Sequence, residues 1–309
     1  MKPSGGLQNF LLINTPESMK KVLFGRRFLV GAAVLSVLIW FSIEVIFDRH
    51  VSTMSEFKEV RNSRTYDKTH KMALLVPFRN CINELKEFAP HMMKFLNNQR
   101  IPYTIYVINQ VDDLRFNRAS LVNIGFLERH PDCDYIAIHD VDLLPLNPKL
   151  NYSFPSEGPF HVSSPELHPL YHYSEFTGGI LLMTREQYEK VNGMSNKFWG
   201  WGAEDDDLAL RILHHGFKTI HPLGLKTGFQ NTFRHIHESK RPRDQARFID
   251  EYKIKRRMDV SSGLNNTRYT VESRNTTLIN GTQVTFINVH ITCDVKITPW
   301  CLMEKRNTR

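Results

Sequence analysis

The sequence predicts an α/β domain with a mixed, mostly parallel sheet flanked by helices. Three short apolar runs, residues 72–78, 104–109 and 134–140, are typical of buried strands. Two segments with helix-like apolar spacing, residues 82–98 and 117–130, separate these runs. The resulting order β-α-β-α-β is typical of parallel strands joined by crossover helices.

The second half of the chain continues this pattern with fewer signals. Residues 178–184 predict another strand, and residues 185–193 predict a short helix that ends at a glycine. A further helix is expected from the acidic run at 204–207 to Gly216. Pro90 should break or kink the first of the predicted helices.

The composition of the 309-residue chain excludes several classes of protein. Hydrophobic residues make up 41% and charged residues 23%, which rules out wholesale disorder, collagen, a coiled coil and a polytopic membrane protein. Forty Lys and Arg residues against 32 Asp and Glu residues give a net charge of +8. This charge permits an acidic partner or substrate but does not demonstrate one.

An apolar segment near the N-terminus has the length of a membrane span. Residues 28–47 contain a single charged residue, Glu44, and a helix of this length covers about 30 Å. Basic residues outnumber acidic ones before the segment, which favours a cytosolic N-terminus. A cleaved signal peptide is the alternative, but the run is long and no small-residue cleavage site follows it. We expect a cytosolic tail at 1–27, a signal anchor at 28–47, a polar stem at 48–70 and one lumenal domain at 71–309.

A lumenal location would allow the cysteines to form disulfides and the sequons to be glycosylated. Cys293 and Cys301 could close a small disulfide loop, although the sequence alone does not fix the connectivity. Cys81 and Cys133 lie near opposite ends of predicted parallel strands, so we expect both to remain thiols. Four Asn-X-Ser/Thr sequons are candidate glycosylation sites: Asn151, Asn265, Asn275 and Asn280.

Two carboxylates directly follow the third predicted strand. Asp140 and Asp142 are two residues apart, so in extended chain both side chains face the same side. Ligands of open α/β sheets bind beyond the carboxyl ends of the strands, where hard oxygen ligands suit Mg²⁺ or Mn²⁺ bridging a diphosphate. The alternative is the solvated start of a loop, because a D-x-D pair arises easily by chance.

His235 and His237 form a second candidate metal-binding pair with the same spacing. Neutral imidazole shifts the preference of a carboxylate site from Mg²⁺ toward Mn²⁺. The chain contains 14 histidines, however, so two ordinary surface histidines are the alternative.

The segment FWGWGAEDDD at 198–207 is the most informative part of the sequence. A tryptophan offers a flat face for a sugar ring, and a carboxylate can accept a hydroxyl proton. Acidic residues also favour helix N-termini, which explains one or two of the four carboxylates but not all of them beside two tryptophans. The intervening glycines permit the loop to move.

Five motifs, in order, resemble those of the β-1,4-galactosyltransferases, and the resemblance extends from about residue 72 to the C-terminal end. They are VPFRN at 76–80, FNRASLVNIGF at 116–126, DYIAIHDVDLLP at 134–145, FTGGILLM at 176–183 and FWGWGAEDDD at 198–207. A second set resembles the family branch that adds galactose to xylose on proteoglycan core proteins. It comprises HPLYHY at 168–173, FRHIH at 233–237, RDQ at 243–245, GLNNTRY at 263–269 and the tail from CD at 293 to TPWC at 301.

The resemblance implies a GT-A fold and inverting transfer from UDP-galactose, with Mn²⁺ as cofactor. It also implies a type II Golgi membrane protein that acts on xylosylated core proteins, with N-acetylglucosamine as the alternative acceptor. A binder that has lost catalysis and a glycoside hydrolase are two further alternatives, and a requirement for metal and UDP-sugar would exclude the hydrolase. A lumenal address argues against nucleic acid as a partner.

The motifs also imply residue roles. Asp205 matches the catalytic base, and Glu204 and Asp206 match acceptor-binding acids. Trp201 matches the tryptophan of a mobile loop that contacts both donor and acceptor. The metal ligands would be Asp142, His235 and His237, and the donor would contact Pro77, Phe78, Arg79, Phe116, Asn117, Arg118, Asp140 and Asp142.

Two tyrosines suggest how xylose would be selected. Tyr171 and Tyr173 point the same way in extended chain, and with Trp201 they would form a narrow aromatic slot. Xylose lacks the exocyclic CH₂OH group, so such a slot admits it and excludes larger sugars. Ordinary loop packing of both tyrosines is the alternative.

The sequence departs from the family pattern in three places. Cys81 stands where an arginine often follows VPFRN, which would loosen one phosphate contact. Asp207 stands where some relatives have glutamate. Residues 238–242 are less like the family, which leaves any contacts to the acceptor peptide there open.

Overall fold

The computed structural model describes residues 70–225, 231–237, 243–244 and 257–302, all within one compact unit, Tyr66–Arg309. The expected tail, the expected anchor and nearly all of the expected stem lie outside these ranges. Among the helices that the structure describes, none has the length and apolar character needed to cross a membrane.

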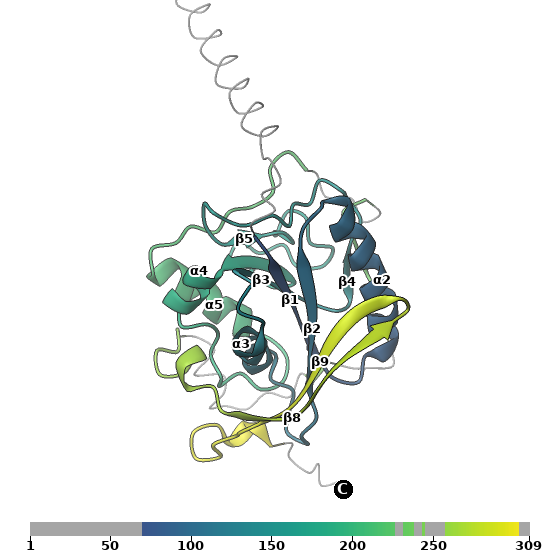
Figure 1. Ribbon diagram of the computed structural model, residues 1–309. Helices are drawn as coiled ribbons and strands as arrows, with labels where there is room; N and C mark the ends of the chain where they lie inside the picture. Colours follow the sequence, from purple (N-terminus) through teal and green to yellow (C-terminus); the bar gives the residue numbers. More distant parts are fainter. Residues whose placement is uncertain (1–69, 226–230, 238–242, 245–256, 303–309) are drawn as a thin grey trace, which may run out of the picture. The chain divides into compact units, whose positions relative to one another are not determined.

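A seven-stranded mixed sheet forms the centre of this unit, with the strand order β5-β6-β3-β1-β2-β9-β8 (Figure 1). Strands β3, β1, β2 and β9 are parallel, whereas β6, β5 and β8 each run antiparallel to their neighbour. The mixed, mostly parallel sheet expected from the sequence is therefore confirmed. The strands are β1 (Met72–Phe78), β2 (Tyr103–Gln110), β3 (Tyr135–His139), β5 (Phe160–His161), β6 (Ile180–Thr184), β8 (Tyr269–Ile279) and β9 (Thr282–Ile291).

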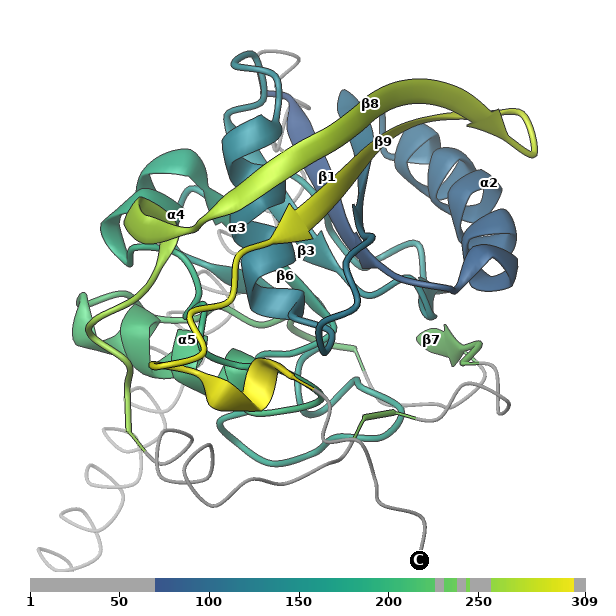
Figure 2. The same cartoon turned by 90° about the horizontal axis from the view of Figure 1, so that it is seen from below.

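Helices cover both faces of the sheet (Figure 2). Strand β1 is buried along its whole length, and its side chains divide between the two faces. Met72, Leu74 and Val76 pack in the core beneath α2, and Ala73 and Leu75 pack in the core beneath the other helices. The helices are α2 (Ile82–Asn98) on one face and α3 (Arg118–Glu128), α4 (Arg185–Lys190) and α5 (Glu204–His214) on the other.

Helix α2 continues through Pro90, so a break at this residue, one of the two expected outcomes, is wrong. Proline has no N–H to donate to the carbonyl four residues earlier, which is that of Lys86. The Nδ2 atom of Asn280, in the turn between β8 and β9, donates to this carbonyl at 2.8 Å. A contact from nearly two hundred residues away thus replaces the missing helix bond.

Two pairs of strands had no counterpart in the sequence predictions. The long hairpin of β8 and β9 extends the sheet through parallel pairing of β9 with β2. A separate two-stranded sheet joins β4 (Leu143–Pro145) to β7 (Phe233–His235). Short 3-10 turns, η1 (Leu264–Asn266) and η2 (Pro299–Cys301), complete the described elements.

The cysteine predictions agree with the structure. Cys293 and Cys301 form a disulfide with their Cα atoms 6.4 Å apart. Cys81 and Cys133 are buried thiols outside any disulfide. Burial raises the pKa of the Cys133 thiol to about 11, so this group is un-ionised at neutral pH.

Candidate active site

The pairing of β4 with β7 brings the three predicted metal ligands together. Leu143 lies opposite His235, and the Ile236 N–H donates to the carbonyl of Asp142 at 2.8 Å. The Oδ2 atom of Asp142 is 2.9 Å from Nδ1 of His237 and 3.5 Å from Nε2 of His235. Burial opposes ionisation of Asp142, but its hydrogen bonds with the two histidines hold its pKa below the usual value.

One carboxylate and two imidazoles are a donor set that suits Mn²⁺. In this structure these donors bond to one another, and Nη2 of Arg243 lies 3.4 Å from Nε2 of His235. Within the described ranges, no set of three or more His, Cys, Asp or Glu side chains is spaced to hold a metal ion. The chemistry of the three side chains therefore fits the metal, whereas their present spacing is that of a hydrogen-bonded cluster.

The predicted donor-binding residues lie at or beyond the carboxyl ends of β1, β2 and β3. Pro77 and Phe78 are the last two residues of β1, and both are buried. Arg79 donates three hydrogen bonds to backbone carbonyls in and after β2, and its guanidinium carbon is 5.8 Å from the centre of the Phe116 ring. These groups form the edge of the sheet at which ligands of α/β proteins bind.

Asn117 caps the N-terminus of α3 and connects it to the loop that contains Asn196. It is fully buried, and its Oδ1 atom accepts a hydrogen bond from the Ser120 N–H at the start of α3. Its Nδ2 atom donates to the carbonyl of Asn196 at 2.9 Å. The contact between Asn117 and the nucleotide stays a prediction.

Arg118 connects the donor side to the acidic run. Its Nη2 atom is 2.7 Å from Oδ1 of Asp140, and its Nη1 atom is 3.7 Å from Oε1 of Glu204. Burial opposes the charge of Arg118, but Asp140, Glu204 and Asp205 raise its pKa above the usual value. The guanidinium is therefore a fixed positive charge between the two groups of acids.

Asp205 stands in the first turn of α5, which follows a left-handed residue, Ala203. Burial, and then the charges of Glu204 and Asp206, raise the pKa of the Asp205 carboxyl to about 8. A Cβ atom at Gly178 would lie 2.3 Å from Oδ2 of Asp205, so only glycine leaves room for this carboxylate.

The predicted aromatic residues lie next to these acids. The hydroxyl of Tyr173 donates to Oδ1 of Asp206 at 2.9 Å. The rings of Tyr171 and Trp201 are 6.4 Å apart. Arg243 joins the pair, because its Nη1 atom donates to the Tyr171 hydroxyl at 2.8 Å and its guanidinium lies 5.3 Å from the Trp201 ring. The sequence assigned Arg243 no role, although it belongs to the RDQ motif.

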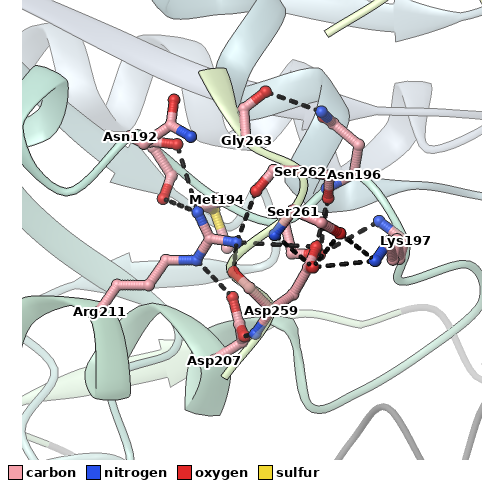
Figure 3. A network of polar contacts seen from close by, with 12 residues as sticks. Asn192, Met194, Asn196, Lys197, Asp207, Arg211, Asp259, Ser261, Ser262 and Gly263 are labelled. Atoms are coloured by element: carbon pink, nitrogen blue, oxygen red, sulfur yellow. Dashed lines mark hydrogen bonds and ion pairs between the residues drawn. The ribbon is translucent and has the colours of Figure 1, made fainter. Parts of the chain in front are cut away.

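The last acid of the run, Asp207, is structural and belongs to a buried network (Figure 3). Arg211 donates to Oδ2 of Asp207 at 2.6 Å, to the carbonyl of Asp259 at 2.6 Å and to that of Ser262 at 2.7 Å. The carboxylate of Asp259 in turn accepts from Nζ of Lys197 at 2.9 Å. The network fixes α5, and with it Asp205, to two neighbouring loops.

Comparisons with known proteins show to which family the chain belongs. Residues 37–155 match the N-terminal region of glycosyl transferase group 7, and residues 158–236 match the N-terminal domain of galactosyltransferase. β-1,4-Galactosyltransferase 7 of Mus musculus is 53% identical over 234 residues, which are 75% of this chain and 71% of the mouse protein. The chain belongs to the β-1,4-galactosyltransferase family.

Two further relatives place this galactosyltransferase within the xylosylprotein branch. Xylosylprotein 4-beta-galactosyltransferase of Caenorhabditis elegans is 44% identical over 284 residues, which cover 89% of this chain and 98% of the worm protein. The crystal structure of the Drosophila β-1,4-galactosyltransferase 7 catalytic domain in complex with xylobiose has 48% identity and a TM-score of 0.74, and covers 76% of this chain and 100% of that chain. A mutant of the Drosophila protein has been crystallised with manganese, UDP-Gal and xylobiose.

Proposed function

We propose that this chain transfers galactose from UDP-galactose to the 4-hydroxyl of xylose on proteoglycan core proteins, with inversion at the anomeric carbon. The position of Asp205 carries this proposal. Its carboxylate, with a raised pKa, interacts electrostatically with Tyr173 and with Arg118, the partner of Asp140. The names of the relatives and the xylobiose and UDP-Gal complexes support the same reaction.

Asp205 takes the proton of the attacking hydroxyl as the new glycosidic bond forms. A sugar hydroxyl is a poor nucleophile, and a positioned base contributes about 10²–10⁴-fold to the rate. The raised pKa makes Asp205 a stronger base than an ordinary carboxylate. One base without a covalent intermediate means a single displacement, so an α-linked donor gives a β-linked product.

The donor diphosphate requires positive charge at the opposite edge of the site. Asp142, His235 and His237 would hold Mn²⁺, which neutralises the charge that develops on the leaving UDP. Arg118 donates to Asp140 and offsets part of the effect of burial, which raises the pKa of that carboxyl. Pro77, Phe78, Arg79, Phe116 and Asn117 would enclose the nucleotide.

Tyr171, Tyr173 and Trp201 form the proposed xylose slot. Tyr173 is held by Asp206 and Tyr171 by Arg243, so both rings are fixed before an acceptor binds. Glu204 and Asp206 would accept hydrogen bonds from the remaining hydroxyls of the sugar. A sugar with an exocyclic CH₂OH or an acetamido group would collide with the slot.

We further propose a type II Golgi location, with residues 28–47 as the anchor and the described domain in the lumen. The Cys293–Cys301 disulfide fits an oxidising compartment. Three of the four sequon asparagines, Asn265, Asn275 and Asn280, are exposed, and Asn151 is partly exposed. Glycans at these positions are compatible with the folded domain.

The test of the proposed function is a side-by-side assay of β-xylosides and β-N-acetylglucosaminides with UDP-galactose, with and without Mn²⁺. We expect transfer to the xyloside, loss of transfer in chelator, and little transfer to the glucosaminide. The double variant Tyr171→Ala/Tyr173→Ala should raise the xyloside KM, whereas Leu170→Ala, at an exposed neighbour, should not. Comparable rates on both sugars would defeat the xylose assignment, and unchanged kinetics in the double variant would defeat the slot.

A further inference from the structure

A buried arginine outside the predicted site holds the segment that carries Asp244. Arg115 lies between β2 and α3, and its side chain is only 1% exposed. Its Nε atom donates to Oδ2 of Asp244 at 2.7 Å, and its Nη2 atom donates to Oδ1 at 3.3 Å. This two-point contact fixes the orientation of the carboxylate as well as its distance.

The backbone of Asp244 holds Trp201 in turn. The Trp201 N–H donates to the carbonyl of Asp244 at 2.8 Å, and the preceding N–H, of Gly200, donates to the carbonyl of Phe116 at 2.8 Å. Gly200 has a φ of 83°, and a Cβ atom there would lie 2.0 Å from Nη2 of Arg115. The tryptophan loop therefore passes directly against the guanidinium that holds Asp244.

Arg115 is itself fixed by the C-terminal disulfide loop. Its N–H donates to the carbonyl of Cys301 at 2.8 Å, and its Nη1 atom donates to the carbonyl of Trp300 at 3.0 Å. Because Cys301 is bonded to Cys293, this support is covalently restrained. A continuous series of contacts thus runs from the disulfide through Arg115 and Asp244 to Trp201.

We propose that Asp244, held by Arg115, is a positioning residue that places Trp201 over the acceptor. This inference rests on the proposed function and adds a specificity-supporting residue to it. The carboxylate is held by Arg115, and Asp244 acts through the hydrogen bond between its backbone carbonyl and the Trp201 N–H. Replacing the Asp244 carboxylate would leave the buried Arg115 guanidinium without this partner. Because the loop at Gly200 packs directly against that guanidinium, we expect the loop to shift.

The experiment compares Asp244→Asn, Asp244→Glu and Arg115→Lys with the wild-type full chain. For each protein we would measure KM and kcat for a simple β-xyloside, the Kd for UDP by calorimetry, and thermal unfolding. Arg274→Ala is the matched control, because it breaks an exposed ion pair between Arg274 on β8 and Glu128 at the end of α3. Asp244→Asn and Arg115→Lys should each raise the xyloside KM at least about tenfold with UDP affinity within about twofold, and Asp244→Glu should recover part of the loss.

Two results would overturn the inference while leaving the proposed function intact. The first is an unchanged xyloside KM in a cooperatively folded Asp244→Asn protein. The second is a parallel loss of UDP affinity, xyloside affinity and thermal stability that Asp244→Glu does not recover, since that is the pattern of a general structural residue. Absence of transfer to the xyloside by the wild-type protein would refute the proposed function, and the inference with it.

Discussion

At the residue scale, the environment of Asp205 sets both its basicity and the cost of ionising it. Asp205→Asn keeps the shape of the side chain but cannot take a proton, so kcat should fall at least about 10²-fold with UDP affinity little changed. In the wild-type protein, kcat/KM should decrease as the pH falls below about 8, the pKa of this carboxyl. A pH-rate profile and calorimetry with UDP check both expectations. Collapse of UDP affinity with preserved kcat would make Asp205 a binding residue instead.

The same residue predicts a change in stability with a defined sign. The pKa of Asp205 is about 8 in the folded protein and 3.8 for an ordinary carboxyl, so the folded state holds the proton more tightly. Its stabilising contribution is complete below about pH 4 and is lost as the pH rises toward 8. Relative to wild type, Asp205→Asn should therefore gain stability between pH 5 and pH 8 in urea unfolding. A trend of the opposite sign would contradict the raised pKa.

At the scale of elements, the sequence predicts what local patterns determine. The strands β1, β2 and β3 are short apolar runs, and their predicted limits agree with the structure to within one residue. Strand β8 has no such pattern, because most of its side chains are exposed and it is held by pairing with β9. The continuity of α2 through Pro90 could not be predicted from the local sequence either, because the donor to the Lys86 carbonyl comes from the distant Asn280.

That contact predicts a measurable contribution of Asn280 to the stability of α2. Asn280→Asp keeps a residue that tolerates the positive φ of this turn, but it removes the donor to the Lys86 carbonyl. We expect a loss of about 1 kcal/mol in the free energy of unfolding. The matched control is Asn275→Asp on the same hairpin, an exposed position whose side chain makes no hydrogen bond within the described residues. Both proteins should be made without N-glycosylation, and equal stability of the two would contradict the contact.

The network beneath α5 predicts a larger effect. Arg211 is buried and joins Asp207 to two backbone carbonyls of the 257–263 segment. Arg211→Ala leaves a buried carboxylate without its cation, which costs about 3–5 kcal/mol. Arg274→Ala, which breaks an exposed pair, should cost less than about 1 kcal/mol. Urea unfolding of the two variants tests the difference, and a small loss in Arg211→Ala would show that the network is replaceable.

At the scale of the whole molecule, the site is assembled from segments that the sequence cannot pair. The residue types of the candidate site were predictable because the ordered motifs resemble those of the family, whereas D-x-D and H-x-H on their own left other interpretations open. Asp142 and the two histidines come together because β4 pairs with β7. These two strands have three residues each and lie about ninety residues apart in the sequence. Arg243 and Asp244 were missed for the same reason, since only the folded chain brings them against Tyr171 and Trp201.

This assembly gives the last prediction, which concerns metal affinity. His237 and His235 reach Asp142 only through the β4–β7 pairing, and His237 is the nearer of the two to the carboxylate. His237→Ala should weaken Mn²⁺ binding by about 10–100-fold in calorimetry, without UDP or acceptor present. His290→Ala is the control, because His290 is an exposed imidazole that also pairs with a carboxylate, Glu272, but lies on the hairpin. Equal Mn²⁺ affinity in the two variants would show that the hydrogen-bonded cluster at Asp142 is not the metal site. A loss of affinity confined to His237→Ala is expected if these three side chains exchange their hydrogen bonds with one another for bonds to the ion.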